Sequence, residues 1–312
     1  MSVEYPAISV GLPVYNGENY LEEALESLMT QDFSDFELII SDNASTDRTP
    51  GILTTWASRD PRIRLHTNET NLGGASNFNR VLDLARGKFF RWASHDDLVT
   101  PDMLSRCSAE LERLGEDYVL VYPQTTVIDE NGDVVEVFDN MLDLRDADPI
   151  RRLRGFIRGY QRSNAMFGLL RTTAIRSTGG IPGYNPGDVV MIGALALSGR
   201  FAELPAPLFS RREHDAMSWR SARTPERFAQ WFDPTREPMI VFPRWRAWRG
   251  LMAAAWHSPH LAASEKVRAT LVLSYEWPRR NLRSLVQELT RIPKVVVRAL
   301  LESRTGATWS AT

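Results

Sequence analysis

The chain has 312 residues, of which 43% are hydrophobic and 24% charged, and its formal net charge is -2 at pH 7. This length accommodates one large domain or a domain with an appendage, and the composition is typical of a soluble globular protein. The single cysteine, Cys107, excludes an intramolecular disulfide framework and an all-cysteine metal site. Neither a signal peptide nor an apolar run of about eighteen residues is found, so a cytoplasmic protein without a membrane-spanning helix is expected.

Charge is distributed unevenly along the chain. From Arg236 onward there are 13 lysines and arginines against 5 acidic residues, whereas residues 1–235 carry 24 against 34. An acidic body with a basic C-terminal region is therefore predicted, and such a split indicates an interaction surface. Nucleic-acid binding is not favoured, because the body is acidic and no RNA- or DNA-binding motif is present.

The first hundred residues alternate short apolar strands with amphipathic helices. Strands are predicted at 7–12, 36–41, 63–67 and 89–93, and helices at 20–29, 49–57 and 74–85. This alternation predicts an α/β fold with a mainly parallel central sheet flanked by helices.

The pattern changes after residue 100. The predicted elements there are a helix at 101–114, a strand at 118–122, a hairpin over 125–138, a helix at 147–160, a strand at 166–170, a helix at 189–197 and a strand at 201–209. Proline and charge accumulate at 224–238. We therefore predict a main domain of residues 1–223, with halves of about 1–100 and 101–223, and a helical C-terminal region of residues 224–312.

The segment Ser94-His95-Asp96-Asp97 follows the predicted strand at 89–93 directly. Its two carboxylates are expected at the carboxyl edge of the sheet, where open α/β sheets bind their ligands. Such oxygen donors suit Mg²⁺ or Mn²⁺ bridging phosphates. The alternative is that Asp96 and Asp97 cap the helix that begins near Pro101.

Two neighbouring strand ends supply further polar residues. Pro13 and Tyr15 follow the first strand and Asp42 ends the second, so the three residues are expected to line one pocket that seats a nucleoside. In the loop after Asp42, Ser45 or Asp47 is predicted to cap the next helix. No glycine-rich phosphate loop occurs, so bound phosphates would need a metal ion to neutralise them.

Several of these segments together resemble the family 2 glycosyltransferases. The matching segments are Pro13-Val14-Tyr15-Asn16, Asp42-Asn43-Ala44-Ser45-Thr46-Asp47, Asn71-Leu72-Gly73 with Asn79, Ala85-Arg86-Gly87, and Ser94-His95-Asp96-Asp97. They occur in the order and spacing of the family across residues 7–215. The resemblance implies the GT-A fold and an inverting enzyme that uses a nucleotide-diphospho-sugar donor.

The resemblance also implies a set of site residues in the first half of the chain. The nucleotide-binding set is Pro13, Tyr15, Asn16, Asp42, Asn71, Asn79, Ser94 and His95. Asp96 matches the usual ligand of the divalent cation, Mn²⁺ or Mg²⁺, while His95 is expected to shape the metal loop. Two positions depart from the family pattern: Ser94 stands where the first acidic residue is usual, and Phe78 where an arginine often precedes the asparagine.

The second half of the chain is expected to supply the catalytic base. An inverting transfer needs a carboxylate that deprotonates the acceptor hydroxyl. Asp188, in Asn185-Pro186-Gly187-Asp188, resembles the acidic motif of the family, and the alternative is that it only caps the helix or favours its dipole. By the same resemblance Arg211 and Arg212 approach the leaving group and His214 reaches the metal or the diphosphate.

Tryptophan and arginine alternate at the start of the basic C-terminal region, in residues 244–256. Together with the basic runs up to residue 301, this pattern suits a helix on an anionic membrane surface, at the inner face of the plasma membrane and near a lipid-linked acceptor. The alternative is that these helices pack on the catalytic domain or on a second copy in a homo-oligomer.

The sequence thus predicts a metal-dependent inverting glycosyltransferase. The expected donor carries UDP, and the expected acceptor is a hydroxyl of a glycolipid or of a cell-envelope polysaccharide precursor. A catalytically degenerate, membrane-associated binding protein stays open because of Ser94 and because Asp188 is the one acid of its motif. A sugar-phosphate nucleotidyltransferase would need a basic, glycine-rich loop where Tyr15-Asn16-Gly17-Glu18 stands.

Overall fold

The computed structural model describes residues 5–138, 142–215, 217, 224–235 and 241–305, with side chains up to residue 290 apart from Pro225. Nine strands of this part of the chain form one sheet, in the order β3-β2-β1-β4-β8-β6-β9-β5 with β7 paired to β6. The strands are β1 (Ile8–Val14), β2 (Phe36–Asp42), β3 (Ile63–Thr67), β4 (Phe89–Trp92), β5 (Leu98–Val99), β6 (Tyr118–Ile128), β7 (Val134–Phe138), β8 (Leu169–Arg171) and β9 (Arg200–Arg212).

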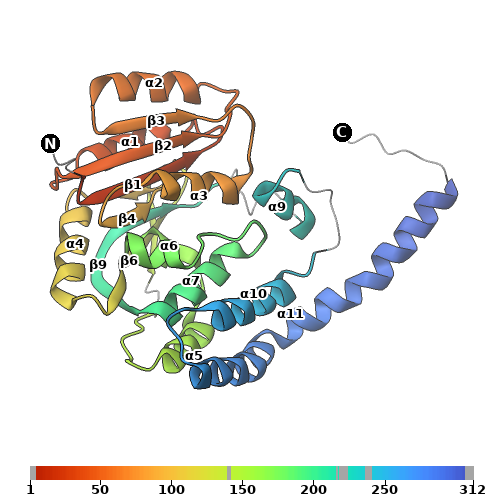
Figure 1. Cartoon of the computed structure of the whole chain (residues 1–312). Coiled ribbons are helices and arrows are strands. Elements are labelled where there is room, and N and C mark those ends of the chain that lie inside the picture. Colours follow the sequence, from red (N-terminus) through yellow and green to blue (C-terminus); the bar gives the residue numbers. More distant parts are fainter. Residues whose placement is uncertain (1–4, 139–141, 216, 218–223, 236–240, 306–312) are drawn as a thin grey trace.

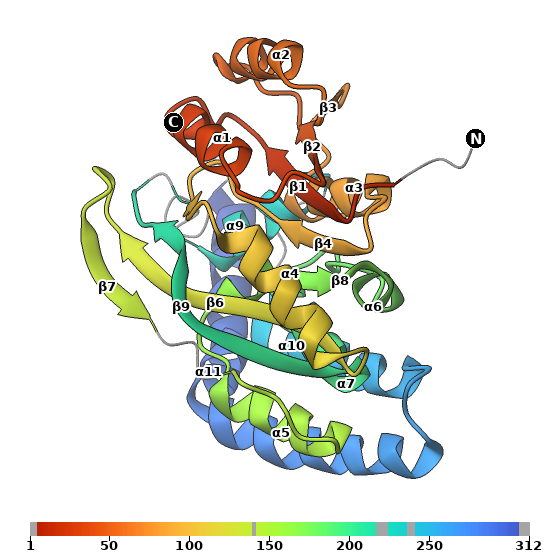
Figure 2. The same cartoon turned by 90° about the vertical axis from the view of Figure 1, so that its left-hand side faces the viewer.

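Helices cover this sheet and extend beyond it. They are α1 (Leu21–Met29), α2 (Thr49–Arg59), α3 (Gly74–Leu84), α4 (Met103–Leu114), α5 (Pro149–Gly159), the 3₁₀ helix η1 (Ser163–Phe167), α6 (Thr172–Ser177), α7 (Gly187–Ser198), α9 (Pro225–Phe232), α10 (Pro243–His257) and α11 (Ala263–Thr305). Figure 1 shows the first strands with α1, α2 and α3 at one end of the molecule, and α5, α7, α10 and α11 at the other. In Figure 2, β6 and β9 run through the middle, with α4 crossing in front of them.

The sheet is mainly parallel, as predicted. Strands β3, β2, β1 and β4 are parallel to one another, β6 is parallel to β9, and β8 joins the two groups by antiparallel pairing with β4 and β6. In the parallel register of β1 and β2, Val14 lies opposite Asp42. The two strand ends that carry the predicted nucleoside residues are therefore neighbours.

Three predicted elements differ from the structure. The strand predicted at 166–170 is shorter and lies later, since 163–167 form η1 and Leu169–Arg171 pair as β8. The strand at 118–122 and the first arm of the hairpin are one strand, β6, which passes through Pro123 where its register with β9 shifts. A proline fits there because it cannot donate to a regular ladder. The helix expected from Pro101 begins at Met103.

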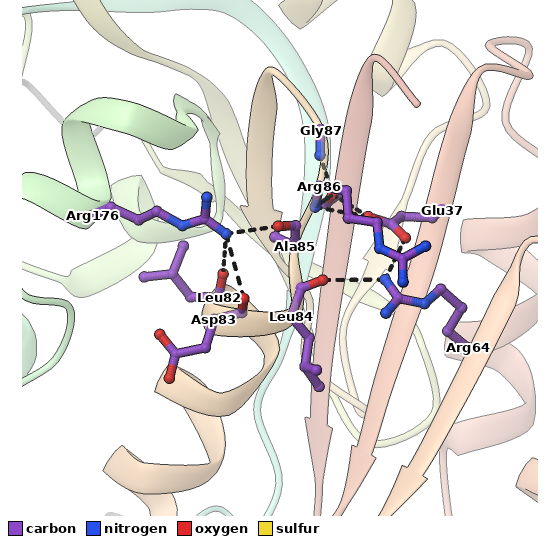
Figure 3. A network of polar contacts seen from close by, with 10 residues as sticks. Glu37, Arg64, Leu82, Asp83, Leu84, Ala85, Arg86, Gly87 and Arg176 are labelled. Carbon is purple, nitrogen blue, oxygen red and sulfur yellow. Dashed lines mark hydrogen bonds and ion pairs between the residues drawn. The ribbon is translucent and has the colours of Figure 1, made fainter. Parts of the chain in front are cut away.

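A polar network holds together the edge of the sheet at the amino ends of β1 and β4, away from the Asp42 and Ser94 loops (Figure 3). The buried Glu37 carboxylate accepts from Ser9 Oγ at 2.6 Å, from Arg64 Nη1 at 2.6 Å and from the backbone N–H of Arg86 at 2.9 Å. Gly87 donates its N–H to Ser9 Oγ at 2.8 Å. The Ala85-Arg86-Gly87 segment therefore serves the sheet through its backbone.

The same figure shows how the last turn of α3 is completed. Arg176 Nη2 donates to the carbonyl oxygens of Leu82 at 3.1 Å and Ala85 at 2.6 Å (Figure 3). A cation at a helix C-terminus satisfies carbonyls that have no partner within the helix and favours the helix dipole. Helix α6, which carries Arg176, is thereby fixed to α3.

The C-terminal helices share a hydrophobic core with the second half of the body. Leu251 of α10 and Trp277 of α11 are buried in the same cluster as Phe156 of α5 and Leu195 of α7. The boundary at residue 224 stays a prediction, but the helices that follow it are packed on the body. No helix in the described ranges is long and apolar enough to cross a bilayer.

The tryptophans that the sequence assigned to a membrane surface are largely internal. Trp245 and Trp248 are partly buried against the core, and their indole N–H groups donate to the carbonyls of Leu285 at 3.4 Å and Leu273 at 3.2 Å. Trp256, by contrast, is 50% exposed. In residues 244–256 the geometry therefore matches the packing alternative more closely than the membrane interpretation.

Candidate active site

One cleft of about 1560 Å³ gathers most of the predicted site residues. It is lined by the segments that follow β1 and β4, the end of β9, the segment from Tyr160 into η1, the start of α7, and parts of α9, α10 and α11. Of the predicted residues, those that line it are Pro13, Tyr15, Asn16, Asn71, Ser94, His95, Asp96, Asp188, Arg211 and His214. Asp42, Asn79 and Arg212 are not part of its lining.

The segment after β1 forms one wall of the cleft. Tyr15 is 42% exposed there, and Asn16 has a positive φ of 49°, which asparagine tolerates better than most residues. Asn16 Oδ1 accepts the N–H of Thr46 at 2.9 Å, so the loops after β1 and β2 are joined. An open aromatic ring beside amide groups can pack on a nucleobase and hydrogen-bond to it.

Two asparagines link the next part of this wall. Asn43 Nδ2 donates to Asn71 Oδ1 at 2.8 Å, and both residues line the cleft. Asn71 Oδ1 also accepts the N–H of Gly73 at 2.8 Å. Asn43 follows Asp42 directly, and no separate role was predicted for it.

Asp42 and Asn79 support the cleft from behind. Asp42 is 1% exposed, and its Oδ1 accepts the N–H of Ser45 at 3.1 Å. Asn79 exchanges two hydrogen bonds of 2.8 Å with the backbone of Ile181, which fixes the segment that leads to α7. Ser45 or Asp47 was predicted to cap α2; the N-cap residue is Arg48, without a side-chain cap, and Asp47 Oδ1 accepts the N–H of Thr49 at 3.0 Å just before the helix.

Asp96 and His214 form a pair inside the cleft. His214 Nε2 lies 3.0 Å from Asp96 Oδ2, and the two residues are 8% and 9% exposed. Ser94 Oγ donates to Asp96 Oδ1. Burial raises the pKa of the Asp96 carboxyl, but the hydrogen bonds from His214 and Ser94 and the charge of His95 outweigh it and hold the pKa well below its usual range.

The Asp96–His214 pair fits a divalent cation. The carboxylate is an oxygen ligand of the kind that Mn²⁺ and Mg²⁺ take, and the imidazole is a nitrogen donor beside it. Within the described residues no group of three or more His, Cys, Asp or Glu side chains forms a metal site, so donor phosphates and water would have to complete the coordination. The ring of His95 packs on Gly17, where a Cβ would lie 2.7 Å from His95 Cδ2, so His95 shapes the loop.

The alternative that Asp96 and Asp97 cap the following helix is wrong. Helix α4 begins after Asp102, and Asp97 instead accepts the N–H of Arg212 at 2.9 Å. Burial and the negative charge of Asp96 raise the pKa of Asp97. This carboxyl is therefore tied to the end of β9.

The two arginines at the end of β9 point in opposite directions, as neighbours on a strand do. Arg211 lines the cleft, and its Nη1 donates to Asn164 Oδ1 at 2.8 Å. Arg212 is 1% exposed and is held by Glu23 Oε2 at 2.6 Å and by the Asp96 carbonyl at 3.1 Å. Of these two arginines, Arg211 is the one positioned to meet a ligand in the cleft.

Asp188 enters the cleft from the first turn of α7. Ser163 Oγ donates to Asp188 Oδ2, and Tyr160 Oη lies 3.5 Å from the same oxygen. Burial and the charge of Asp188 raise the pKa of Tyr160 well above its ordinary value, so this hydroxyl stays protonated. Both described bonds of the carboxylate go to side chains near η1, which argues against a capping role.

An aromatic group from the C-terminal region completes the cleft beside α3. Phe78 and Trp231 line it, with their ring centroids 6.5 Å apart in an edge-to-face arrangement. At Gly73 (φ 83°) a Cβ would lie 2.4 Å from the carbonyl oxygen of Phe232, so α9 packs closely on this loop. The departure from the family at Phe78 thus coincides with an aromatic partner from α9.

Comparisons with known sequences bear on this site. A model described as glycosyl transferase family 2 matches residues 9–171, just over half of the chain. An uncharacterized glycosyltransferase of Rickettsia bellii is 33% identical over 134 residues, which cover 42% of this chain and 19% of that protein. One of Methanocaldococcus jannaschii is 32% identical over 138 residues, or 44% of this chain and 47% of that protein. The chain spans less than half the length of either relative.

Solved structures share the fold. S. aureus TarS 1–349 in complex with UDP-GlcNAc gives a TM-score of 0.64 at 18% identity, with 90% of this chain and 79% of that chain covered. A mannosyltransferase of Pyrobaculum calidifontis in complex with GDP-Man and Mn²⁺ gives 0.52 at 18% identity, with 98% and 89% covered. At these identities the likeness establishes the fold, and it confirms the predicted GT-A architecture. Together with the match over residues 9–171, it leads to one conclusion: the chain belongs to glycosyltransferase family 2.

Proposed function

We propose that the protein is an inverting glycosyltransferase that moves a sugar from a nucleotide-diphospho-sugar to an acceptor hydroxyl. The observation that carries the proposal is the arrangement around η1. Adjacent residues there hold the two groups that the reaction needs, since Ser163 donates to Asp188 and Asn164 accepts from Arg211. A carboxylate and a guanidinium are thus fixed beside one another in the same cleft.

In this mechanism Asp188 is the general base. Its Oδ2 is occupied by Ser163, so Oδ1 is the oxygen that takes the proton of the acceptor hydroxyl. The acceptor oxygen forms a bond to the anomeric carbon while the bond from that carbon to the donor phosphate oxygen breaks. The configuration at the anomeric carbon is inverted in this single displacement.

The departing diphosphate gains negative charge, and we assign its stabilisation to Arg211, which lines the cleft together with Arg162, Arg227 and Arg244. Asp96 and His214 would hold the divalent cation, which when bound neutralises the diphosphate. Tyr15, Asn16, Asn43 and Asn71 form the wall proposed for the nucleoside, and the buried Asp42 supports it by accepting the N–H of Ser45.

The proposed donor carries UDP or GDP. The structural neighbour TarS is described with UDP and UDP-GlcNAc, and the mannosyltransferase with GDP-Man and Mn²⁺, which supports testing these two nucleotides first. The cleft of about 1560 Å³ exceeds the roughly 300–1,000 Å³ of a single ligand pocket, which leaves room for the acceptor. We propose a glycolipid or a cell-envelope polysaccharide precursor as that acceptor.

Nucleotide binding is the first part of the test. Thermal melting is measured with UDP, GDP and dTDP, each with Mn²⁺ and with EDTA. A nucleotide at about 100 times its Kd stabilises the folded state by roughly 2.7 kcal/mol. We expect one nucleotide to raise Tm with Mn²⁺, and Asp96→Ala to lose the Mn²⁺-dependent part of that shift.

Turnover is the second part. Release of the nucleoside diphosphate is measured from UDP-sugars and GDP-mannose, with Asp188→Asn as the variant and the exposed Glu112→Gln as its control. Asp188→Asn should keep the Tm shift and lose at least about 100-fold in turnover. Absence of any shift and any turnover contradicts the proposal and favours a degenerate binding protein. Release of pyrophosphate from a nucleoside triphosphate and a sugar phosphate favours a nucleotidyltransferase.

A further inference from the structure

Helix α11 carries a row of large apolar side chains on the face turned away from the core. This outer row consists of Val267, Leu271, Tyr275, Leu282, Val286 and Leu289, which are between 49% and 65% exposed. Successive members are three, four or seven residues apart, so they share one face of the helix over about 33 Å. The surface face of a helix is normally polar, and a contiguous apolar row of this kind marks an interaction surface.

The opposite face of α11 accounts for its packing on the body. Trp277 and Leu273 are buried, and Glu288 accepts the N–H of Arg244 at 2.9 Å. Ser284 and Gln287 line the catalytic cleft together with Glu288. Helix α11 therefore separates the cleft from the outer row, and Figure 1 shows it running from the packed helices α5 and α10 past the edge of the body.

Arginines flank the outer row on the side of α5. Helix α5 has four arginines and no acidic residue. Arg151, Arg154 and Arg158 have side chains that are 72%, 48% and 62% exposed. Arg268, Arg279 and Arg283 of α11 are also exposed, and helical spacing puts them along one edge of the outer row. Four of these six arginines form ion pairs with acidic residues of the same side, Arg151 with Asp146, Arg154 and Arg158 with Glu276, and Arg268 with Asp148. With Glu265 there are four acidic residues, so the six arginines leave a surplus of positive charge there.

We propose that the outer row of α11 and the arginines beside it bind the surface of an anionic phospholipid bilayer. Apolar side chains on one face with arginines along their edge are what an interfacial helix needs, because the row enters the headgroup region and the cations meet anionic lipid. A second copy packed antiparallel through the row would bring two arginine bands to one side of the interface, where they repel. The bilayer is the occupant with complementary charge.

Membrane binding at this surface would also bring a lipid-linked acceptor to the proposed active site, and this part of the inference rests on the proposed function. A bilayer held at the outer row lies against the helix that also lines the cleft, so a lipid-linked acceptor would reach Asp188 from the membrane. The binding itself does not depend on catalysis. It can therefore be measured separately from turnover.

The test is co-sedimentation of the full chain with large unilamellar vesicles of phosphatidylcholine alone or with about one third phosphatidylglycerol. We expect strong binding only to the anionic vesicles, weakened by salt. Leu271→Gln with Leu282→Gln should lower the partition coefficient at least about tenfold, because two apolar groups no longer leave water. Val135→Gln with Val137→Gln, at 64% and 59% exposed positions of β7, is the matched control and should bind like the wild type.

The proposal is overturned if the Leu271/Leu282 variant binds vesicles as the wild type does, or if the wild type does not prefer anionic lipid. It is also overturned if the wild type is a dimer in sedimentation equilibrium that this variant dissociates, with no vesicle binding by either. Donor hydrolysis should be the same in the variant and the wild type. If neither the wild type nor the variant hydrolyses the donor, but the wild type binds anionic vesicles, the proposed function is contradicted and the membrane-binding proposal is retained.

Discussion

Replacing Ser163 by alanine removes the hydroxyl that donates to Asp188 Oδ2 and leaves the backbone of η1 unchanged. A hydrogen bond to a charged group contributes about 1.5–3 kcal/mol, or roughly 10- to 150-fold in rate if it is lost only in the transition state. Because Asp188 lines an open cleft, water can replace part of the bond. We expect kcat to fall by about 10- to 30-fold in Ser163→Ala.

Steady-state kinetics with a donor and a small acceptor would measure this change. The KM for the donor and the metal-dependent Tm shift should stay as in the wild type, since Ser163 acts on the base. Ser163→Thr keeps a hydroxyl and should recover most of the activity. Tyr160→Phe should cost at most about threefold, because Tyr160 Oη lies 3.5 Å from the carboxylate, at the limit of a hydrogen bond.

Two results would refute this reasoning. If Ser163→Ala turns over like the wild type, Ser163 does not orient the base. If Ser163→Ala and Ser163→Thr both lose activity together with the nucleotide-induced Tm shift, the effect lies in the folding of η1, and Asp188 would have to be tested by its own variant alone.

Three further predictions concern stability and reactivity. Glu37→Gln should lower the free energy of unfolding, measured in urea, by about 2 kcal/mol, because Arg64 and the backbone N–H of Arg86 lose a charged acceptor. The control Glu112→Gln, in the exposed pair with Lys88, should change it by at most about 0.5 kcal/mol. Equal effects of the two substitutions would contradict the role of the Glu37 network. The hydrogen bond from Arg158 lowers the pKa of Glu276, so the charged Glu276 stabilises the folded state above the ordinary carboxyl pKa of about 4.3. This contribution is lost as the pH falls through the lowered pKa. The difference in free energy of unfolding between the wild type and Glu276→Gln should therefore shrink from pH 7 to pH 3, and a constant difference would rule this out. Burial raises the pKa of Cys107 to about 12, so iodoacetamide at pH 8 should label it only in denaturant, and rapid labelling of the folded chain would show that the site opens.

The sequence identified the first half of the fold well because its pattern is local. Leu21, Ala24, Leu25 and Leu28 have helical spacing, and all four are buried on α1. The segment around Met166 was assigned wrongly because a short apolar run does not distinguish a strand from a 3₁₀ turn. The strand predicted at 118–122 ends before Pro123, whereas β6 continues through this proline where its register with β9 shifts.

The site was predictable to the extent that its residues sit in contiguous motifs. Asp96 and Asp188 could be proposed from the segments around them, and the structure brings both into one cleft. Which of Arg211 and Arg212 faces the cleft depends on the orientation of β9, which no local pattern reveals. Ser163, Asn164 and Trp231 reach the site only through tertiary packing, so no signal in their own segments indicates them.

The packing of α11 on α5 also has a consequence for folding during translation. Arg280 donates to the carbonyl oxygens of Ile157 and Tyr160, at the end of α5. About 90 residues separate Asp188 from Arg280 along the chain. At about 5–20 residues per second, a ribosome adds them in roughly 5 to 20 s. During that interval the nascent chain already contains the strands of the nucleotide side, but the contact of Arg280 with the carbonyls of Ile157 and Tyr160 cannot yet form.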